Sequence, residues 1–280
     1  MRFEFNQKLK LDRRSVELRK EIVRAVASSS RRGHIGASFS LVEIVRVLYD
    51  EILKYDSQNP KWFERDRFIL SKGHGCLALY VMLAEKGFFP KEELTRFCLP
   101  GGILGGHPEF HKVPGVEAST GSLGHGLSIG LGFALNARID KTNQRVFVVL
   151  GDGESNEGSV WEAALCIGKH CLSNLTVLID YNKQQSFGMV SEVQELEPFA
   201  DKWRAFGFAI KEVNGHDVEE LRRILKELPL EQNKPTALIC HTIKGMGTEL
   251  TKGNLAWHHK TKITEEETES LLKALETEHL

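Results

Sequence analysis

The sequence shows no excess of charge of either sign. Its 37 Lys and Arg residues are balanced by 38 Asp and Glu residues, which leaves a formal net charge of −1. Proteins that bind nucleic acid or anionic membranes through broad electrostatic attraction carry a basic excess, so we expect neither as a partner. A local phosphate site stays open, because backbone amides and a metal ion bind phosphate without a basic surface.

Long apolar runs and paired cysteines are also missing. No stretch approaches the roughly 20 apolar residues that span a membrane, and residues 1–15 lack the apolar core of a signal peptide. The cysteines are odd in number, form no CxxC pair and lie scattered at Cys76, Cys98, Cys166, Cys171 and Cys240. Free thiols in a reducing compartment fit this pattern better than disulfides or zinc. We therefore expect a cytoplasmic protein.

Short apolar runs alternate with helical patterns along the 280 residues. Five runs predict β-strands, at 67–70, 146–150, 175–180, 208–213 and 236–242. Apolar residues recur at helical spacing at 11–29, 40–53, 76–87, 90–97, 123–139, 156–170, 196–206 and 217–227. Continuous apolar strands that alternate with helices indicate an α/β fold, a parallel sheet with helices on both faces. We expect one domain over residues 1–280, with a loop at 244–265 and a C-terminal helix.

Two helix starts and one buried helix face follow from the same patterns. Ser40 is the expected N-cap of the helix at 40–53, and Ser155 or Asn156 should open the helix at 156–170. The apolar side chains of that second helix should face the core; they belong to Trp161, Ala164, Leu165 and Gly168.

Polar residues follow three of the predicted strands, where ligands bind in open parallel sheets. The run at 146–150 leads into Gly-Asp-Gly with Asp152, and the run at 175–180 leads into Asn182. Oxygens of Asp152 and Asn182 on adjacent strand ends can meet on one Mg²⁺, which also keeps phosphate oxygens as ligands. Turn residues of these types are common at strand ends, but the strand–turn–helix–strand context favours a metal site.

Gly-Asp-Gly followed by Asn after nearly thirty residues is the fingerprint of thiamine diphosphate enzymes. Six blocks, in order along the chain, resemble the transketolase family: GHIGAS (33–38), LSKGHGCLALY (70–80), GGHPE (105–109), TGSLGHGLSIGLGFA (120–134), GDGESNEGSVWEAA (151–164) and WHHK (257–260). The resemblance implies a thiamine diphosphate-binding fold and a transferase. Such an enzyme moves a two-carbon ketol unit from a ketose, usually phosphorylated, to an aldose.

The resemblance also implies a set of cofactor ligands. The side chains of Asp152 and Asn182 and the main-chain carbonyl of Gln184 would bind Mg²⁺, for which Ca²⁺ or Mn²⁺ can substitute. The diphosphate would be contacted by the Gly153 amide and two histidines, and the aminopyrimidine by two residues of TGSLG. The implied cofactor-binding residues are therefore His74, Gly121, Leu123, Asp152, Gly153, Asn182 and His258.

Four further residues match catalytic positions of the family. His34 and His107 match substrate-facing histidines, and imidazole suits proton transfer in both directions near neutral pH. Glu157 and Glu162 match acidic positions that relay protons between paired subunits; the alternative is a solvated helix face, which we consider for Glu154 as well. The other histidines are expected to be ordinary surface or loop residues: His111, His170, His216, His241 and His259.

Departures from the family pattern occur at His125, Ser186, Phe187 and His259, where relatives more often carry Gln, Ile, Asp and Gly. The family's second α/β domain, with the glutamate that activates the pyrimidine, has no counterpart in the sequence. The resemblance therefore implies self-association and a separate C-terminal transketolase subunit, in an α₂β₂ assembly held by large apolar interfaces. A sugar or sugar phosphate would be the substrate.

Three other functions remain as alternatives. The chain could be the α subunit of a 2-oxo acid dehydrogenase or decarboxylase, it could perform deoxyxylulose-phosphate synthase-like chemistry, or it could be a non-catalytic subunit that retains the fold. The histidine-bearing blocks at 33–38, 70–80 and 105–109 favour transketolase over the first, and the family of the second is normally one long chain. Intact Asp152 and Asn182 argue against the third.

Overall fold

The computed structural model describes residues 10–257, 260 and 262–279. Five parallel strands form one sheet in the order β1-β2-β3-β5-β4. Their bounds are Arg67–Leu70 (β1), Val146–Gly151 (β2), Leu175–Tyr181 (β3), Ala209–Asn214 (β4) and Thr236–His241 (β5). The five strands agree with the apolar runs of the sequence to within a residue. The predicted parallel sheet is confirmed.

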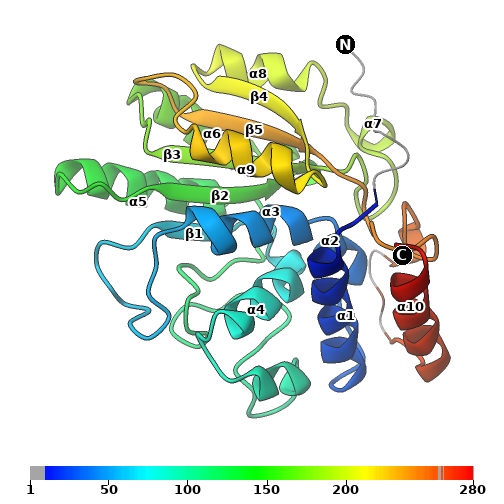
Figure 1. Cartoon of the computed structure of the whole chain (residues 1–280). Helices are drawn as coiled ribbons and strands as arrows, with labels where there is room; N and C mark the ends of the chain where they lie inside the picture. The colour runs from blue at the N-terminus through cyan, green and yellow to red at the C-terminus, as the bar shows by residue number, and fades with distance from the viewer. Residues whose placement is uncertain (1–9, 258–259, 261, 280) are drawn as a thin grey trace.

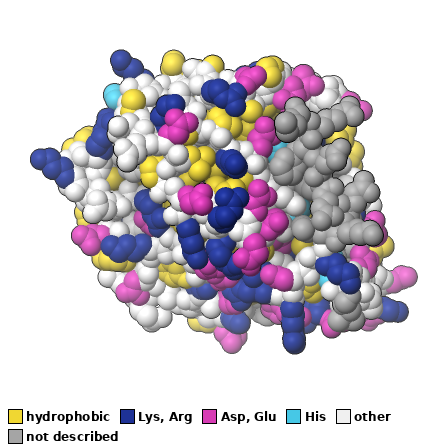
Figure 2. All heavy atoms as spheres, turned by 45° about the horizontal axis from the view of Figure 1, so that its top comes forward, with side chains coloured by type: hydrophobic (Ala, Val, Ile, Leu, Met, Phe, Trp, Pro, Cys, Tyr) yellow, Lys and Arg dark blue, Asp and Glu magenta, His cyan; other side chains and the backbone are white. Residues whose placement is uncertain are grey.

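Helices cover both faces of this sheet (Figure 1). One face carries α1 (Arg13–Ala27), α2 (Ile35–Phe39), α3 (Val42–Val47), α4 (Cys76–Glu85), α9 (Val218–Lys226) and α10 (Glu265–Thr277). The other carries α5 (Gly126–Ile139), α6 (Gly158–Lys169) and α8 (Phe199–Ala205). No helix in the described part of the chain is long and apolar enough to cross a membrane. On the surface seen in Figure 2, basic and acidic side chains are intermixed.

Strand side chains alternate between two cores, as the pleat of a β-strand requires. In β2, Phe147 and Val149 belong to the core under α1 and α4, whereas Val146, Val148 and Leu150 belong to the core under α5 and α6. Both faces of the central strands are buried, which is why those runs are continuously apolar.

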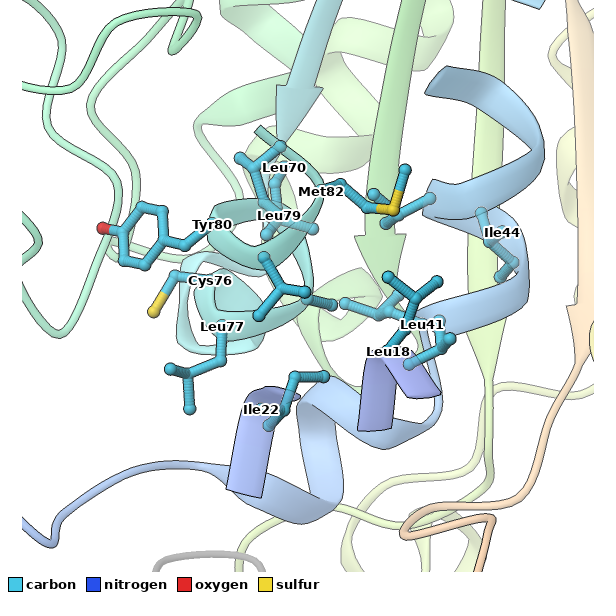
Figure 3. Close-up of a cluster of buried hydrophobic side chains, with 14 of the residues drawn as sticks. Leu18, Ile22, Leu41, Ile44, Leu70, Cys76, Leu77, Leu79, Tyr80 and Met82 are labelled. Carbon is cyan, nitrogen blue, oxygen red and sulfur yellow. The ribbon is translucent and has the colours of Figure 1, made fainter. Parts of the chain in front are cut away.

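Helix α4 is buried on almost every side, and it joins the core to the loops above it. Leu77, Leu79 and Met82 belong to the same buried cluster as Leu18 and Ile22 of α1 (Figure 3). On another side of the same helix, the Tyr80 hydroxyl shares its hydrogen bond between two main-chain carbonyls, those of Gly105, at 3.1 Å, and His107, at 2.8 Å. The loop that carries His107 is therefore held by a buried helix.

The first and last helices lie side by side (Figure 1). Asp12 caps α1 by accepting from the Ser15 amide at 2.8 Å. Thr264 and Glu267 form a reciprocal capping box at the start of α10. Buried Leu271 and Leu275 of α10 complete the core beside α1.

Three local predictions are wrong. The segment 40–53 is divided into the end of α2, the short α3 and a π-helical turn (Leu48–Ile52). Ser40 is the C-cap of α2 instead of an N-cap, because its hydroxyl donates to the buried Asp180 side chain at 2.6 Å. A 3₁₀ turn (Gly153–Asn156) precedes α6, whose N-cap is Glu157 instead of Ser155 or Asn156. A short helix α7 (Val190–Val193) and two 3₁₀ segments (Gly73–Gly75 and Lys91–Arg96) complete the described helical elements between the strands.

The buried face of α6 differs from the expected one. The residues that pack into the core are Val160, Ala163, Ala164 and Ile167, a regular i, i+3, i+4, i+7 stripe. Ala164 belongs to this stripe as predicted, and Gly168 approaches the Phe206 carbonyl too closely for any side chain. Leu165 projects from the opposite side with 60% of its surface exposed, so its prediction as a core residue is wrong. Trp161 is half-buried against the rings of α8.

Two histidines expected on the surface are buried. His241 lies within β5, and His216 follows β4 and contacts Glu43. His216 Nε2 accepts from the Ile243 amide at 2.9 Å, so Nδ1 carries the proton that is donated to Glu43 at 2.8 Å. His111 and His170 are exposed, as expected.

Glu43 also forms a two-pronged ion pair with Arg19 of α1, and both side chains are fully buried. Burial alone would raise the pKa of Glu43, but the Arg19 guanidinium and the His216 N–H hold it well below its usual value. The pair joins α1, α3 and the segments that follow β4 and β5.

Replacement of Glu43 by Gln should lower the free energy of unfolding by about 3–5 kcal/mol, because it leaves the Arg19 charge buried without a partner. Urea denaturation of the chain measures this loss. Glu21→Gln is the matched control, since Glu21 pairs with Arg24 on the exposed face of α1, and it should change stability by less than about 0.5 kcal/mol. Equal effects of the two substitutions would contradict the role of the buried pair.

Candidate functional site

The ends of β2 and β3 bring Asp152 and Asn182 together. The two strands pair in parallel with Gly151 opposite Asp180, so both side chains leave the same edge of the sheet. The Asp152 amide donates to the Asp180 carbonyl at 3.3 Å, and the Asp152 carboxylate accepts from the amides of Gly153 and Lys183. The carboxylate therefore lies against the turn that follows Asn182.

Three kinds of oxygen lie in or beside this turn. The Asn182 amide nitrogen donates to Asp180 at 3.2 Å, which fixes its Oδ1 toward the Gln184 amide at 3.0 Å. The Gln184 carbonyl accepts from the Lys244 ammonium at 3.0 Å. The turn thus gathers a carboxylate, a side-chain amide oxygen and a main-chain carbonyl, which are ligands for a hard cation such as Mg²⁺.

The charges at the turn are compatible with a bound cation. Burial, with the neighbouring Asp180 carboxylate, raises the pKa of Asp152 to about 7, so the ionised carboxylate needs positive charge nearby. Burial also lowers the pKa of Lys244 to about 8. Within the described residues, no group of three His, Cys, Asp or Glu side chains forms a metal site. The residues at the turn fit an oxygen-ligated cation, and they do not fit zinc.

Asp180 holds this turn in place through buried hydrogen bonds, a role that the sequence analysis did not predict. Its carboxylate accepts from Lys72 and Thr242 as well as from Ser40 and Asn182, and all five side chains are buried. Burial alone would raise the pKa of Asp180, but the Lys72 ammonium holds it below its usual value. An acidic residue that ends an apolar strand was the one sign of this role in the sequence.

Glu154 is a second buried support, and the alternative of a solvated helix face does not hold for it. Its carboxylate accepts from the amides of Gly124, at 2.9 Å, and Gly151, at 3.0 Å, and from the Ser71 hydroxyl. These contacts join three of the Gly-rich blocks at one carboxylate. Burial raises the pKa of Glu154. Its position inside a Gly-rich turn was the available signal.

Three histidines lie close to one another. The rings of His34 and His74 meet edge to face, with centroids 5.6 Å apart. His34 and His107 line a cavity of about 330 Å³, together with Cys76 and Phe97. Gly121 has a φ of +133°, and a Cβ there would lie 2.8 Å from His107 Cδ2, so the loop packs directly on the His107 ring.

The remaining site residues lie in different places. Leu123 is half-buried, and its carbonyl contacts the His125 ring at 3.0 Å. Glu157 and Glu162 are exposed on α6 and do not line the cavity. His258 and His259 lie outside the described residues. Lys244, which contacts the Gln184 carbonyl, had been noted in the sequence only as part of a loop.

Comparisons with known proteins agree with this geometry. Residues 12–279 match the family model for the transketolase thiamine diphosphate-binding domain. The chain is 42% identical over 246 residues to the 6-deoxy-6-sulfo-D-fructose transketolase subunit SqwG of Clostridium sp. (strain MSTE9), which covers 88% of this chain and 89% of that one. It is 40% identical over 266 residues to an apulose-4-phosphate transketolase subunit of Phocaeicola vulgatus, with 95% and 94% covered.

Solved structures give the same result. A transketolase from Pichia stipitis superimposes with a TM-score of 0.83 at 28% identity, over 94% of this chain and 43% of its own length. A transketolase from Leishmania mexicana gives a TM-score of 0.81 at 28% identity, over 94% and 44%. This chain therefore spans less than half the length of the solved transketolases that it matches. The chain belongs to the transketolase family of transferases, and it corresponds to the thiamine diphosphate-binding part of a transketolase.

Proposed function

We propose that the chain is the N-terminal subunit of a thiamine diphosphate-dependent transketolase and is active only with a separate C-terminal subunit. It transfers a two-carbon ketol unit from a ketose, in its phosphorylated form, to an aldose. One observation supports the proposal: Asp152 follows β2, and Asn182 and Gln184 follow the neighbouring strand β3 at the same edge of the sheet. A histidine-lined cavity lies in the same chain.

The oxygens of these three residues are the proposed Mg²⁺ ligands. Asp152 supplies the negative charge, and Asn182 and the Gln184 carbonyl are the other ligands that the protein supplies. Ca²⁺ or Mn²⁺ can replace Mg²⁺. Other residues would contact the diphosphate and the aminopyrimidine of thiamine diphosphate: Gly121, Leu123, Gly153, His74 and, outside the described residues, His258. When bound, thiamine diphosphate supplies the electron sink that carbon–carbon cleavage beside a ketone requires.

The chain's own share of the chemistry is proton transfer and positioning. His34 and His107 face one cavity, where their imidazoles bind substrate oxygens and exchange protons with the hydroxyl groups. The Gly121 loop and the Tyr80 hydroxyl fix the His107 segment from two sides. A rigid histidine of this kind reduces the entropy lost when the substrate is aligned.

The proposed assembly is an α₂β₂ heterotetramer in the cytoplasm that acts in carbohydrate metabolism. Its α subunit is a single domain over residues 1–280, and two relatives at full-length coverage are themselves named as subunits. Exposed Ile129 and Leu165 lie on the paired helices α5 and α6, where Gly132 has open space above it. An apolar face of this kind fits self-association. Glu157 and Glu162 lie exposed on α6, where a proton relay between copies requires them.

Asp152→Ala should weaken Mg²⁺-dependent binding of thiamine diphosphate to the reconstituted complex by more than about 100-fold, since it removes the charged metal ligand. Isothermal titration calorimetry measures the affinity, and circular dichroism checks the fold. Asp140→Ala, at the exposed end of α5, is the matched control and should bind normally. Unchanged binding by the Asp152 variant would refute the metal assignment, whereas a wild-type complex without Mg²⁺-dependent cofactor binding would favour a non-catalytic subunit.

His107→Ala should leave cofactor binding intact and lower kcat by about 10²–10⁴-fold, because it removes a proton-transfer group without touching the metal ligands. Steady-state ketol transfer measures this effect. His111→Ala, a nearby exposed histidine outside the cavity lining, should keep full turnover. A His107 variant with normal kcat would exclude this residue from the chemistry.

The isolated chain should show no ketol transfer, and activity should appear when its cognate C-terminal subunit, Mg²⁺ and thiamine diphosphate are added. The physical reason is that the described residues supply the metal and diphosphate half of the site. A coupled assay with ketose donors measures the gain, and 2-oxo acids tested in parallel detect dehydrogenase- or decarboxylase-type activity. Full turnover by the chain alone would contradict the split-enzyme proposal.

A further inference from the structure

We propose that Cys98 is a site of reversible oxidation by peroxide, and that buried Cys76 then forms a disulfide with it that closes the histidine-lined cavity. Both thiols line this cavity together with His34 and His107. The disulfide follows from the positions of the two sulfurs, whereas its effect on turnover rests on the proposed function.

The two sulfurs lie against the same glycine. The Cys76 thiol donates to the Gly106 carbonyl at 3.2 Å, and a Cβ placed on Gly106 would lie 3.7 Å from Cys98 Sγ. The sulfurs also interact electrostatically, since the Cys98 thiol adds to the rise that burial causes in the pKa of Cys76. The two thiols are therefore neighbours at a residue that has no side chain.

The two cysteines differ as a reactive thiol and a resolving thiol do. Cys98 is exposed, so peroxide reaches it directly. Burial raises the pKa of its thiol, but the charges of Arg32 and Lys112 and the Ser30 hydroxyl oppose that rise. These three groups favour the thiolate, which is the form that attacks peroxide. Cys76 is buried, so peroxide reaches it last.

Cys76 lies on a helix, and Cys98 lies in a glycine-rich loop. Cys76 is the first residue of α4 and projects from the same side of that helix as Tyr80 (Figure 3). Residues 98–106 read CLPGGILGG, and glycines widen the range of conformations open to such a loop. A disulfide holds its two Cβ atoms about 3.5–4.5 Å apart. The bond would therefore draw the loop of Cys98 onto α4 and narrow the cavity that both residues line.

The other three cysteines do not line this cavity. Cys240 is buried within β5. Cys166 and Cys171 lie in and just after α6, on the other face of the sheet. Because Cys171 is exposed, as Cys98 is, it serves as the matched control.

One molecule of hydrogen peroxide balances the oxidation. The Cys98 thiolate attacks the peroxide, an S–O bond forms, the O–O bond breaks, and the thiol's proton leaves in the released water. The Cys76 sulfur then attacks the sulfenic acid at Cys98, the S–S bond replaces the S–O bond, and a second water leaves. Two thiols have lost two electrons, which the peroxide has gained. A dithiol reverses the change by exchange, and disulfides of this transient kind are the ones found in reducing compartments.

The first test maps the disulfide in the complex reconstituted with its C-terminal subunit, Mg²⁺ and thiamine diphosphate. After brief treatment with hydrogen peroxide, free thiols are alkylated and unreduced peptides are identified by mass spectrometry. Peptides linked through Cys76 and Cys98 should appear, and dithiothreitol should separate them. In Cys76→Ser, the sulfenic acid at Cys98 should persist and be trapped by dimedone. Cys171→Ser should form the same link as the wild type.

The second test measures turnover. Peroxide should lower ketol transfer roughly tenfold or more in the wild-type complex and in Cys171→Ser, and dithiothreitol should restore it. In Cys98→Ser, which lacks the reactive thiol, activity should fall by less than about twofold from its own untreated value. A complex without any ketol transfer before oxidation would defeat only the proposed function, because the linked peptides form without a substrate.

Three results would overturn the inference. The first is the absence of peptides linked through Cys76 and Cys98 after peroxide treatment. The second is a loss of activity in Cys98→Ser as large as that of the wild type. The third is a linked form with unchanged turnover, which would show that the disulfide leaves the cavity open.

Discussion

The Asp180 carboxylate is the contact on which the geometry of the site depends. It lies at the end of β3 and receives hydrogen bonds from Lys72 after β1, Ser40 after α2 and Thr242 after β5. A buried charge is tolerated only when it is paired and hydrogen-bonded. The carboxylate therefore keeps each of these segments in place against the end of β3. Asn182 takes its orientation from the same carboxylate.

Glu154 also holds several segments together through buried hydrogen bonds. It joins the loops of Ser71 and Gly124 to the turn after β2, and the Gly121 loop then packs on His107. The oxygens at the strand ends and the histidine-lined cavity are therefore parts of one connected arrangement. We assign neither Asp180 nor Glu154 a contact with the substrate. Both residues position the loops that carry the candidate site residues.

The sequence predicted the features that local patterns encode. The five strands are continuous apolar runs because both faces of the sheet are covered, and strand ends locate Asp152 and Asn182 once the sheet is parallel. Ser40, Glu154 and His216 could not be assigned, because their partners are 140, 30 and 173 residues away in the chain. Leu165 was misassigned because apolar spacing alone does not distinguish a side chain that faces the core from one that is exposed.

The pairing of α1 with α10 links the ends of the described chain to the cavity wall. Gly33 bridges to Lys260 in antiparallel fashion, and α10 begins only five residues later and is anchored on α1. Detachment of α10 would therefore loosen the Gly33–Lys260 bridge at the cavity wall before the central sheet is disturbed. Partial melting of this helix would then change the shape of the histidine-lined cavity, while the turns after β2 and β3, which are built on the strand ends, stay intact.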